Sequence, residues 1–163
     1  METRLFTLFE EDEKEIFLSH MEAETYPSGE IIFTEGDKPD SMYLIEEGTV
    51  QVYFERKGKE IDLAQLSKGD FFGEMAILRK DKRSASIKTI EESRILSIDR
   101  ETIINIVNQN GILAAKFLFN LAEIIAERLA KTNKEVENYF LISDALVENE
   151  AFRKLYFKTH KNN

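Results

Sequence analysis

One stretch of the sequence, from Phe72 to Thr89, contains residue types that together can bind a nucleotide. Gly73 has no Cβ, so the backbone there can approach a ligand closely. Glu74 can accept hydrogen bonds from a pair of hydroxyls, and the planar guanidinium of Arg83 suits a phosphate. Ser84 adds a hydroxyl donor beside the arginine. Because a nucleotide presents a sugar diol and a phosphate, this acid and this cation predict a nucleotide site.

The residues between the acid and the arginine can strengthen such a site. If the segment from Met75 to Leu78 is a short helix, its free N–H groups add an end that favours anions. The plainer interpretation of Glu74 and Arg83 is a salt bridge that closes a β-turn. The whole stretch, rather than this pair alone, favours the nucleotide site.

This stretch resembles the phosphate-binding cassette of the cyclic nucleotide-binding domain family. The resemblance rests on Phe-Gly-Glu-Met-Ala-Ile-Leu at residues 72–78 and Arg-Ser-Ala at residues 83–85, and it extends back to Tyr-Pro-Ser-Gly at residues 26–29. Many members have proline just before the arginine, where this chain has Lys82, which loosens the loop and adds positive charge. The cassette positions implied to bind the ligand are Gly73, Glu74, Met75, Ala76, Arg83, Ser84 and Ala85.

The resemblance also implies a role for the main members of this set. Glu74, helped by the Gly73 backbone, binds the ribose 2′-hydroxyl. Arg83 holds the cyclic phosphate together with Ser84 and the backbone N–H of Ala85. The implied ligand is cyclic AMP or cyclic GMP, no further cofactor is expected, and catalysis is not implied.

Composition limits the class of protein. The 163 residues fit one domain with some extra helix, and 42% hydrophobic with 33% charged residues is typical of a soluble globular protein. No apolar run approaches the roughly 20 residues that span a bilayer, and the first residues lack the pattern of a signal peptide. We therefore expect a cytoplasmic protein without membrane contact. A net charge of −9 argues against nonspecific attraction to nucleic acid.

The chain is poor in residues for metal and thiol chemistry. It has no cysteine, which excludes disulfides, thiolate nucleophiles and cysteine-ligated iron–sulfur clusters. Its two histidines, His20 and His160, lie at opposite ends of the sequence. One alternative for the function is a metal-dependent enzyme on a jelly roll, which usually needs a histidine-rich site. Because the chain has only two histidines, we expect no metal site and no enzyme.

Short runs rich in β-branched and aromatic residues follow residue 29 and alternate with separators that contain glycine. Their spacing of about ten residues predicts an antiparallel sandwich or roll. Before them, residues 5–24 have apolar spacings compatible with one or two short helices, and Asp99 is a good N-cap for a helix to about Asn108. The predicted strands are Glu30–Thr34, Ser41–Ile45, Thr49–Phe54, Ile61–Leu66, Ser84–Thr89 and Arg94–Ile98.

Together with the resemblance, this pattern gives the fold class: mainly β with flanking helices, a double-stranded β-helix (jelly roll) with a long C-terminal dimerisation helix. The expected division is an N-terminal helical segment at residues 1–25, the cyclic nucleotide-binding β-roll at 26–110, and C-terminal helices at 111–163.

The long helix predicted from Ile112 to about Phe140 carries apolar residues at steps of three and four, among them Leu121, Ile125 and Leu129. At 1.5 Å per residue it would be about 40 Å long, more than a small roll can cover. We predict that it pairs with the same helix of a second copy in a homodimer. The alternative is that the whole helix packs on its own roll.

Residues 127–138 of this helix are similar to the dimer helix of the catabolite activator protein (Crp/Fnr) branch of the family. The similarity places Thr132 and Asn133 where that branch has two polar residues that reach the purine. It favours cyclic AMP, whereas Ser84 could instead contact guanine and favour cyclic GMP. The plainer interpretation of Thr132 and Asn133 is a polar notch on a solvated helix face.

After residues 141–144 we predict a last amphipathic segment, Ala145 to Phe157, and a polar tail to Asn163. These residues are too few for a helix-turn-helix domain, so direct DNA contact is not expected from this chain. The sequence thus predicts a sensor in signal transduction that binds a cyclic nucleotide and changes the disposition of its C-terminal helices. The alternative is the sensor portion of a Crp/Fnr-family regulator of transcription that lacks its DNA-binding domain.

Overall fold

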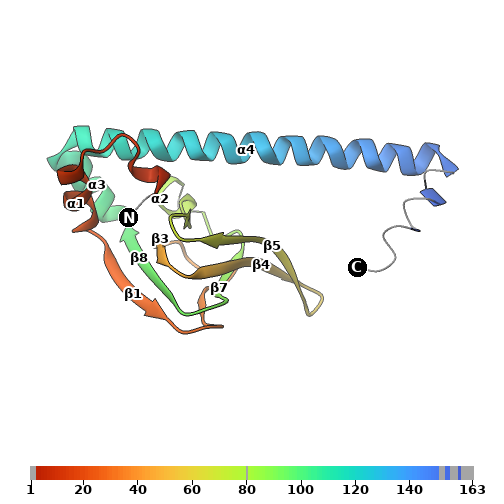
Figure 1. Ribbon diagram of the computed structural model, residues 1–163, viewed down its shortest axis with the longest axis horizontal. Helices are drawn as coiled ribbons and strands as arrows, with labels where there is room; N and C mark the ends of the chain where they lie inside the picture. Colours follow the sequence, from red (N-terminus) through yellow and green to blue (C-terminus); the bar gives the residue numbers. More distant parts are fainter. Residues whose placement is uncertain (1–2, 80, 151–152, 155–157, 159–163) are drawn as a thin grey trace. The chain divides into compact units, whose positions relative to one another are not determined.

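The computed structural model describes residues 3–79, 81–150, 153–154 and 158, and the chain forms two compact units, residues 1–121 and 122–163. The first unit contains all the strands (Figure 1). Its elements before the long helix are η1 (Arg4–Phe6), α1 (Glu11–Leu18), β1 (Glu22–Tyr26), β2 (Ile31–Phe33), β3 (Ser41–Glu47), β4 (Thr49–Arg56), β5 (Lys59–Ser67), β6 (Phe71–Phe72), α2 (Met75–Leu78), β7 (Ser86–Thr89), β8 (Ser93–Asp99) and α3 (Arg100–Gln109).

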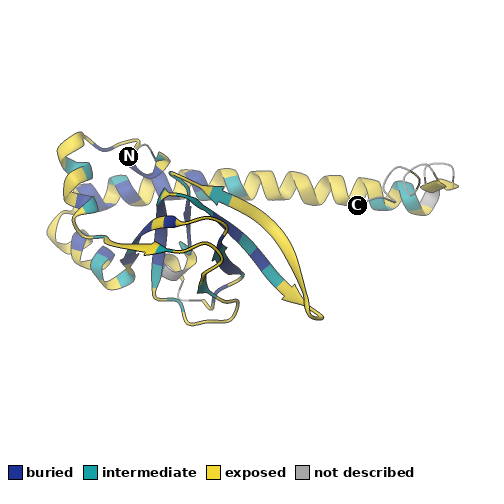
Figure 2. Cartoon of the chain, turned by 60° about the horizontal axis from the view of Figure 1, so that its bottom comes forward, coloured by how far each residue is buried: buried dark blue, intermediate teal, exposed yellow. Residues whose placement is uncertain are grey.

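The strands form two four-stranded antiparallel sheets, in the orders β1-β8-β3-β6 and β2-β7-β4-β5. One core cluster joins them, because it takes side chains from the inner faces of both sheets. Figure 2 shows buried residues in the strands and also in the helices of the first unit. The predicted jelly roll is therefore confirmed. This cluster consists of Tyr43, Ile45, Val50, Phe72, Ile87 and Ile95.

The β4–β5 hairpin shows how local sequence sets a turn. Lys57 and Gly58 both have positive φ, 55° and 71°, as the two central residues of a type I′ turn require. Glycine adopts this conformation without steric cost, and the twist of such a turn matches that of the flanking strands. The strands of this hairpin accordingly pair along their length, from Thr49 with Ser67 to Arg56 with Lys59.

All six predicted strands are present with shifted ends, and two further strands were missed. The first is β1, whose residues we expected to end a helical segment. Its sequence, Glu-Ala-Glu-Thr-Tyr, contains good helix formers, but each residue pairs with β8, from Glu22 with Ser97 to Tyr26 with Ser93. The second is β6, whose two residues pair with Tyr43 and Leu44. Pairing partners that are distant in sequence decided both strands.

The helix after β8 begins as predicted. Asp99 is the N-cap of α3, and its Oδ1 accepts a hydrogen bond from the backbone N–H of Thr102 at 2.6 Å. The following helix, α4, runs from Gly111 to Glu148. The predicted break at residues 141–144 is wrong, since no glycine or proline interrupts the helix there.

The end of α4 has its own cap. Nε and Nη2 of Arg153 donate hydrogen bonds to the carbonyls of Leu146 and Val147 at 2.7 and 3.0 Å. These carbonyls belong to the last turn, whose acceptors have no partner within the helix. The predicted segment to Phe157 lies partly outside the described residues. Within the described part of the chain, no helix is long and apolar enough to cross a membrane.

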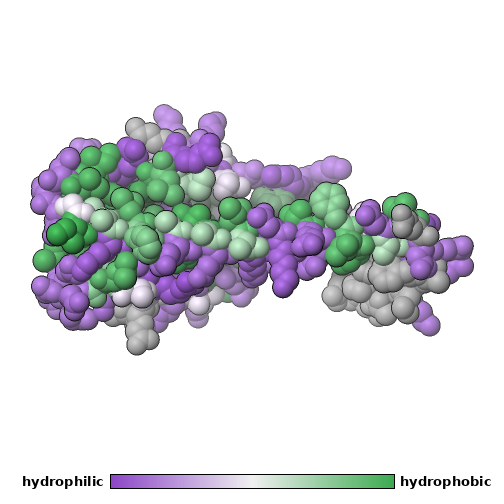
Figure 3. All heavy atoms as spheres, turned by 90° about the horizontal axis from the view of Figure 1, so that it is seen from above, coloured by the Kyte–Doolittle hydropathy of each residue, from purple (hydrophilic) through white to green (hydrophobic). Residues whose placement is uncertain are grey.

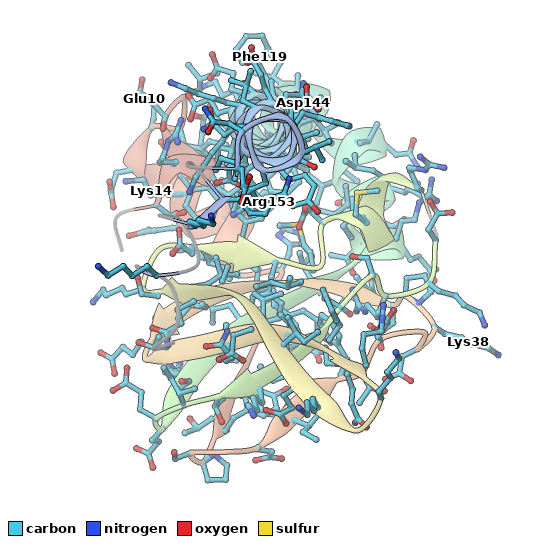
Figure 4. The ribbon with its side chains drawn as sticks, turned by 90° about the vertical axis from the view of Figure 1, so that its right-hand side faces the viewer. Glu10, Lys14, Lys38, Phe119, Asp144 and Arg153 are labelled. Carbon is cyan, nitrogen blue, oxygen red and sulfur yellow. The ribbon has the colours of Figure 1, made fainter. Side chains whose placement is uncertain are left out.

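The first three turns of α4 belong to the first unit and pack inside it. Phe117 stacks on Phe17 with ring centres 4.6 Å apart, and buried Asn120 donates from Nδ2 to the carbonyl of Leu5 at 2.8 Å. Its place in the apolar stripe suggested that Leu121 faces a second copy. This is wrong, because Leu121 is only 1% exposed and is buried in its own unit. Phe119 projects away from the sheets instead and is exposed (Figure 4). The helix therefore has two apolar faces in this unit.

Candidate ligand-binding site

The cassette spans the connection between β6 and β7. Its first turn, Gly73 and Glu74, leads into α2, and the carbonyl of Glu74 accepts hydrogen bonds from the N–H groups of Ile77 and Leu78 at 3.1 and 3.2 Å. The short helix that we expected between the acid and the arginine is present, from Met75 to Leu78.

Arg83 is held by its backbone and by two aromatic rings. Its N–H donates to the carbonyl of Asp37 at 3.1 Å, and its carbonyl accepts from Gly36 at 2.8 Å. The guanidinium carbon lies 4.1 Å from the centre of the Phe33 ring and 5.6 Å from that of Tyr43. A cation over an aromatic face is attracted by the ring quadrupole. These contacts fix an arginine whose side chain is 4% exposed.

The hydrogen bonds of Arg83 leave its donors incompletely used. Nη2 donates to Asp40 Oδ1 at 2.7 Å and to the carbonyl of Ser41 at 2.9 Å. Among the described residues, Nη1 makes only a long contact, 3.4 Å, with the carbonyl of Gly73. Nε is buried and has no hydrogen-bond partner among the described residues. A buried donor without a partner costs about 1–3 kcal/mol. An anionic ligand at this guanidinium would remove that cost.

Gly73 lies directly against the arginine. Its φ is +74°, and a Cβ built there would lie 2.7 Å from Nη1 of Arg83 and 3.1 Å from the carbonyl of Ser41. Any side chain would therefore be strained in its backbone and would displace the guanidinium. We expected the glycine to allow close approach to a ligand, and the structure shows close approach to the residue predicted to bind the phosphate.

The other cassette residues lie along the same connection. Glu74 is the N-cap of α2 and is half-buried, Met75 is exposed, and Ala76 lies within the helix. Ser84 is exposed and Ala85 is half-buried between Arg83 and β7. The structure thus brings Gly73 and Arg83 into contact, and the ion pair of Arg83 is with Asp40. The roles of these residues toward a ligand stay predictions.

Sequence reasoning missed the residues that contact Arg83: Phe33, Asp40 and Tyr43 at its guanidinium and Asp37 at its backbone N–H. Burial raises the pKa of the Tyr43 phenol, and the charge of Asp40 adds to this rise. The backbone N–H and hydroxyl of Thr34 donate to Asp37 at 2.8 and 2.9 Å and lower the pKa of its carboxyl. These bonds stabilise the turn whose carbonyl accepts from Arg83. The only available signal was the turn-rich sequence from Glu35 to Asp40, which does not reveal its distant partner.

Thr132 and Asn133 lie in the second unit, where both side chains are exposed on α4. The hydroxyl of Thr132 donates to the carbonyl of Arg128 at 3.0 Å, one helical turn earlier. Both residues therefore present polar groups on the helix surface. Among the described residues, no group of three or more histidine, cysteine, aspartate or glutamate side chains could hold a metal ion.

Known proteins are similar to this chain in sequence and in fold. The family model described as "Cyclic nucleotide-binding domain" matches residues 23–110. The chain is 32% identical over 127 residues to the cyclic AMP receptor protein of Thermus thermophilus, which covers 77% of this chain and 57% of that protein. It is 33% identical over 126 residues to the cAMP-activated global transcriptional regulator CRP of Pasteurella multocida, with 76% and 58% covered.

A solved structure extends the comparison to the fold. The crystal structure of the Thermus thermophilus catabolite activator protein has a TM-score of 0.78 and 30% identity, covering 86% of this chain and 64% of that chain. The chain spans less than two thirds of the length of these relatives. They are named as receptors, activators and regulators, not as enzymes.

Proposed function

The chain belongs to the cyclic nucleotide-binding domain family, and we propose that it is a sensor that binds cyclic AMP and changes the disposition of its C-terminal helices within a homodimer. One observation carries the proposal: the guanidinium of Arg83 is buried, and its Nε has no hydrogen-bond partner within the described part of the chain. We propose binding without catalysis, in the cytoplasm, as expected from the sequence.

The proposed phosphate contacts centre on Arg83. A cyclic phosphate carries one negative charge, which one guanidinium can neutralise through charge-assisted hydrogen bonds. Ser84 and the backbone N–H of Ala85 follow directly in the chain and would add neutral donors. Because the guanidinium already packs against the Phe33 ring and lies close to Gly73, little side-chain freedom would be lost on binding the ligand.

The proposed ribose contact is Glu74. Its position as N-cap of α2 fixes the backbone on which the carboxylate stands, beside the turn at Gly73. An ionised carboxylate accepts hydrogen bonds only, which suits the 2′-hydroxyl donor of a ribose. The backbone of Met75 and Ala76 begins α2 and would complete this part of the site.

The proposed purine contacts are Thr132 and Asn133. Asn133 can both donate and accept, as the N6 and N7 edge of adenine requires. Its side chain is exposed in the second unit, and so is that of Thr132. We propose cyclic AMP as the ligand on this basis, with cyclic GMP as the alternative if Ser84 contacts the base.

The proposed dimer surface is a seam on the second unit's part of α4. Exposed residues recur there at alternating steps of four and three, the seven-residue period of a left-handed coiled coil. Figure 3 shows apolar side chains exposed along this helix and interrupted by polar ones. A second copy would cover the seam, which consists of Ala122, Ala126, Leu129, Asn133, Val136 and Phe140.

The place of Asn133 in this seam links the two proposals. A polar residue at one central position of a coiled coil fixes the register of the helices at some cost in stability. A purine that bound Asn133 would therefore act on residues of the seam itself. A ligand shifts an equilibrium between two helix arrangements only by its differential affinity for them, and contact with this seam would provide such a difference.

Titration calorimetry with cyclic AMP, cyclic GMP and adenosine 5′-monophosphate tests the proposal. We expect cyclic AMP to bind more tightly than cyclic GMP, and both more tightly than the linear nucleotide. A chain that binds none of the three would refute the sensor. A chain that prefers cyclic GMP would keep the sensor and refute the base assignment.

A second candidate is the sensor portion of a DNA-binding regulator of transcription. The observation that favours it is the partial coverage of relatives that are named as transcriptional regulators. The length of the parent gene separates the candidates, because a regulator of transcription also encodes a DNA-binding domain. A gel-shift assay of this chain with and without cyclic AMP tests whether these residues contact DNA by themselves. We expect no retention of DNA by residues 1–163, given a net charge of −9.

A further inference from the structure

The guanidinium at the proposed phosphate site is already hydrogen-bonded to a carboxylate of the chain, that of Asp40. Asp40 Oδ1 lies 2.7 Å from Nη2 of Arg83 and also accepts the backbone N–H of Ser41 at 2.6 Å. The Asp40 side chain is 72% exposed, whereas that of Arg83 is 4% exposed. The aspartate therefore stands at the solvent side of the arginine, where a ligand must enter.

This carboxylate does not use all the donors of the guanidinium. Nη2 has the carbonyl of Ser41 as a second acceptor, Nη1 makes only the 3.4 Å contact with Gly73, and Nε is without a partner among the described residues. The arginine can thus offer donors to a phosphate while Asp40 stays bonded to it. The bound phosphate would then lie close to a negative charge.

In this arrangement, the charge of the ligand decides how favourably it binds beside Asp40. A cyclic phosphate is a diester with one negative charge, whereas a phosphate monoester carries about −1.5 to −2 at pH 7. Arg83 contributes one positive charge, and the negative charge of Asp40 neutralises much of it. A second ligand charge would therefore face a carboxylate at short range, where like charges repel strongly.

We propose that Asp40 is a specificity-determining residue that makes the cassette accept the singly charged cyclic phosphate and reject the doubly charged phosphate of a linear nucleotide. This inference rests on the proposed function of the cassette, and Asp40 itself lies outside the cassette in sequence. It directly precedes β3, far from the cassette in sequence, and only the fold brings its carboxylate to Arg83.

Asp40→Asn tests the proposal with little change in shape. The amide oxygen can still accept from Ser41 and from Arg83, but the charge is gone. We expect calorimetric titrations of the whole chain to show a gain of about tenfold for adenosine 5′-monophosphate and of less than about threefold for cyclic AMP. The matched control is Asp62→Asn, which removes one charge from an exposed residue of β5 and should leave both affinities unchanged.

A second measurement needs no variant. The 5′-phosphate methyl ester of adenosine is a linear nucleotide with one charge, so the unaltered protein should bind it about tenfold more tightly than adenosine 5′-monophosphate. Equal affinities for these two linear ligands would overturn the proposal. The proposal would also be overturned if Asp40→Asn strengthened the binding of both nucleotides equally, because Asp40 would then only compete with any phosphate for Arg83. It would likewise be overturned if the variant bound both nucleotides more weakly, because Asp40 would then only hold Arg83 in position. An unaltered protein that does not bind cyclic AMP refutes the proposed function instead.

Discussion

The cassette in the first unit and the helix surface in the second unit differ in how their side chains are fixed. Arg83 has backbone bonds, ring contacts and an ion pair within its own unit. Leu129, Val136 and Phe140 are 59%, 49% and 61% exposed on α4. The cassette arginine is therefore held in place by contacts within its own unit, whereas these apolar side chains of the helix are left exposed to solvent.

This difference separates two kinds of apolar residue on one helix. Leu121→Glu would place an unpaired charge in the core of the first unit, and we expect it to lower the free energy of unfolding by about 4–5 kcal/mol or to prevent folding. Leu129→Glu is the matched control on the exposed seam. It should leave the stability of the first unit within about 0.5 kcal/mol and convert the dimer to a monomer. Thermal unfolding and analytical ultracentrifugation measure both. A stable Leu121→Glu variant would contradict the burial of this residue, and a monomeric unaltered protein would contradict the seam.

Arg83→Ala removes the central group of the preorganised region. We expect cyclic AMP affinity to fall by about 2–3 kcal/mol, because a charge-assisted contact is lost. Since the side chain is buried against Phe33 and Tyr43, the free energy of unfolding should also fall, by about 1–3 kcal/mol. Arg79→Ala is the control, because this arginine pairs with Asp81 near the surface. Unchanged affinity in calorimetry would remove the cassette from the site.

Gly73→Ala tests the close approach to the guanidinium. The new Cβ would meet Nη1 of Arg83 and a carbonyl, so we expect about 1–2 kcal/mol less stability and a weaker phosphate contact. Gly29→Ala is a matched control, because it has a similar φ of +84° and no atom within 4 Å of the added Cβ. It should show the backbone cost without the loss of affinity. Equal affinities for cyclic AMP in the two variants would mean that the contact with Arg83 is unimportant.

Glu74→Gln changes the proposed ribose contact more gently. An amide still accepts one hydrogen bond, so we expect a loss of about 1–1.5 kcal/mol in cyclic AMP affinity, less than for Arg83→Ala. A 2′-deoxy cyclic AMP should bind both proteins with nearly the same affinity. A loss larger than that of Arg83→Ala would show that the sugar and phosphate roles are misassigned.

The exposed region should contribute selectivity instead of phosphate affinity. Thr132→Ala with Asn133→Ala should remove the preference for cyclic AMP over cyclic GMP, about 1 kcal/mol for a neutral hydrogen bond, and leave the phosphate affinity mostly intact. Competition titrations of the two nucleotides measure this preference. If the double variant keeps the preference, the helix does not contact the purine and another residue selects the base.

Much of the fold could be predicted because its signals are local. Glycine-containing separators, β-branched runs and the N-cap at Asp99 act through the backbone of their own residues, and the six predicted strands, α2 and the start of α3 are present. β1 could not be predicted in this way, because its residues favour a helix and only pairing with β8 makes them a strand. Nor could spacing alone tell that Leu121 is buried in its own unit, because α4 has more than one apolar face.

The sequence by itself determined the cassette, since Gly73, Glu74, Arg83 and Ser84 lie within one segment whose residue types match a sugar and a phosphate. Only the tertiary structure decided what surrounds the arginine. Phe33, Asp40 and Tyr43 come from earlier turns and strands, and the two packed sheets bring them to the guanidinium. The physical reason is that burial and charge at a site depend on every segment that packs there, whereas residue type and spacing describe one segment at a time.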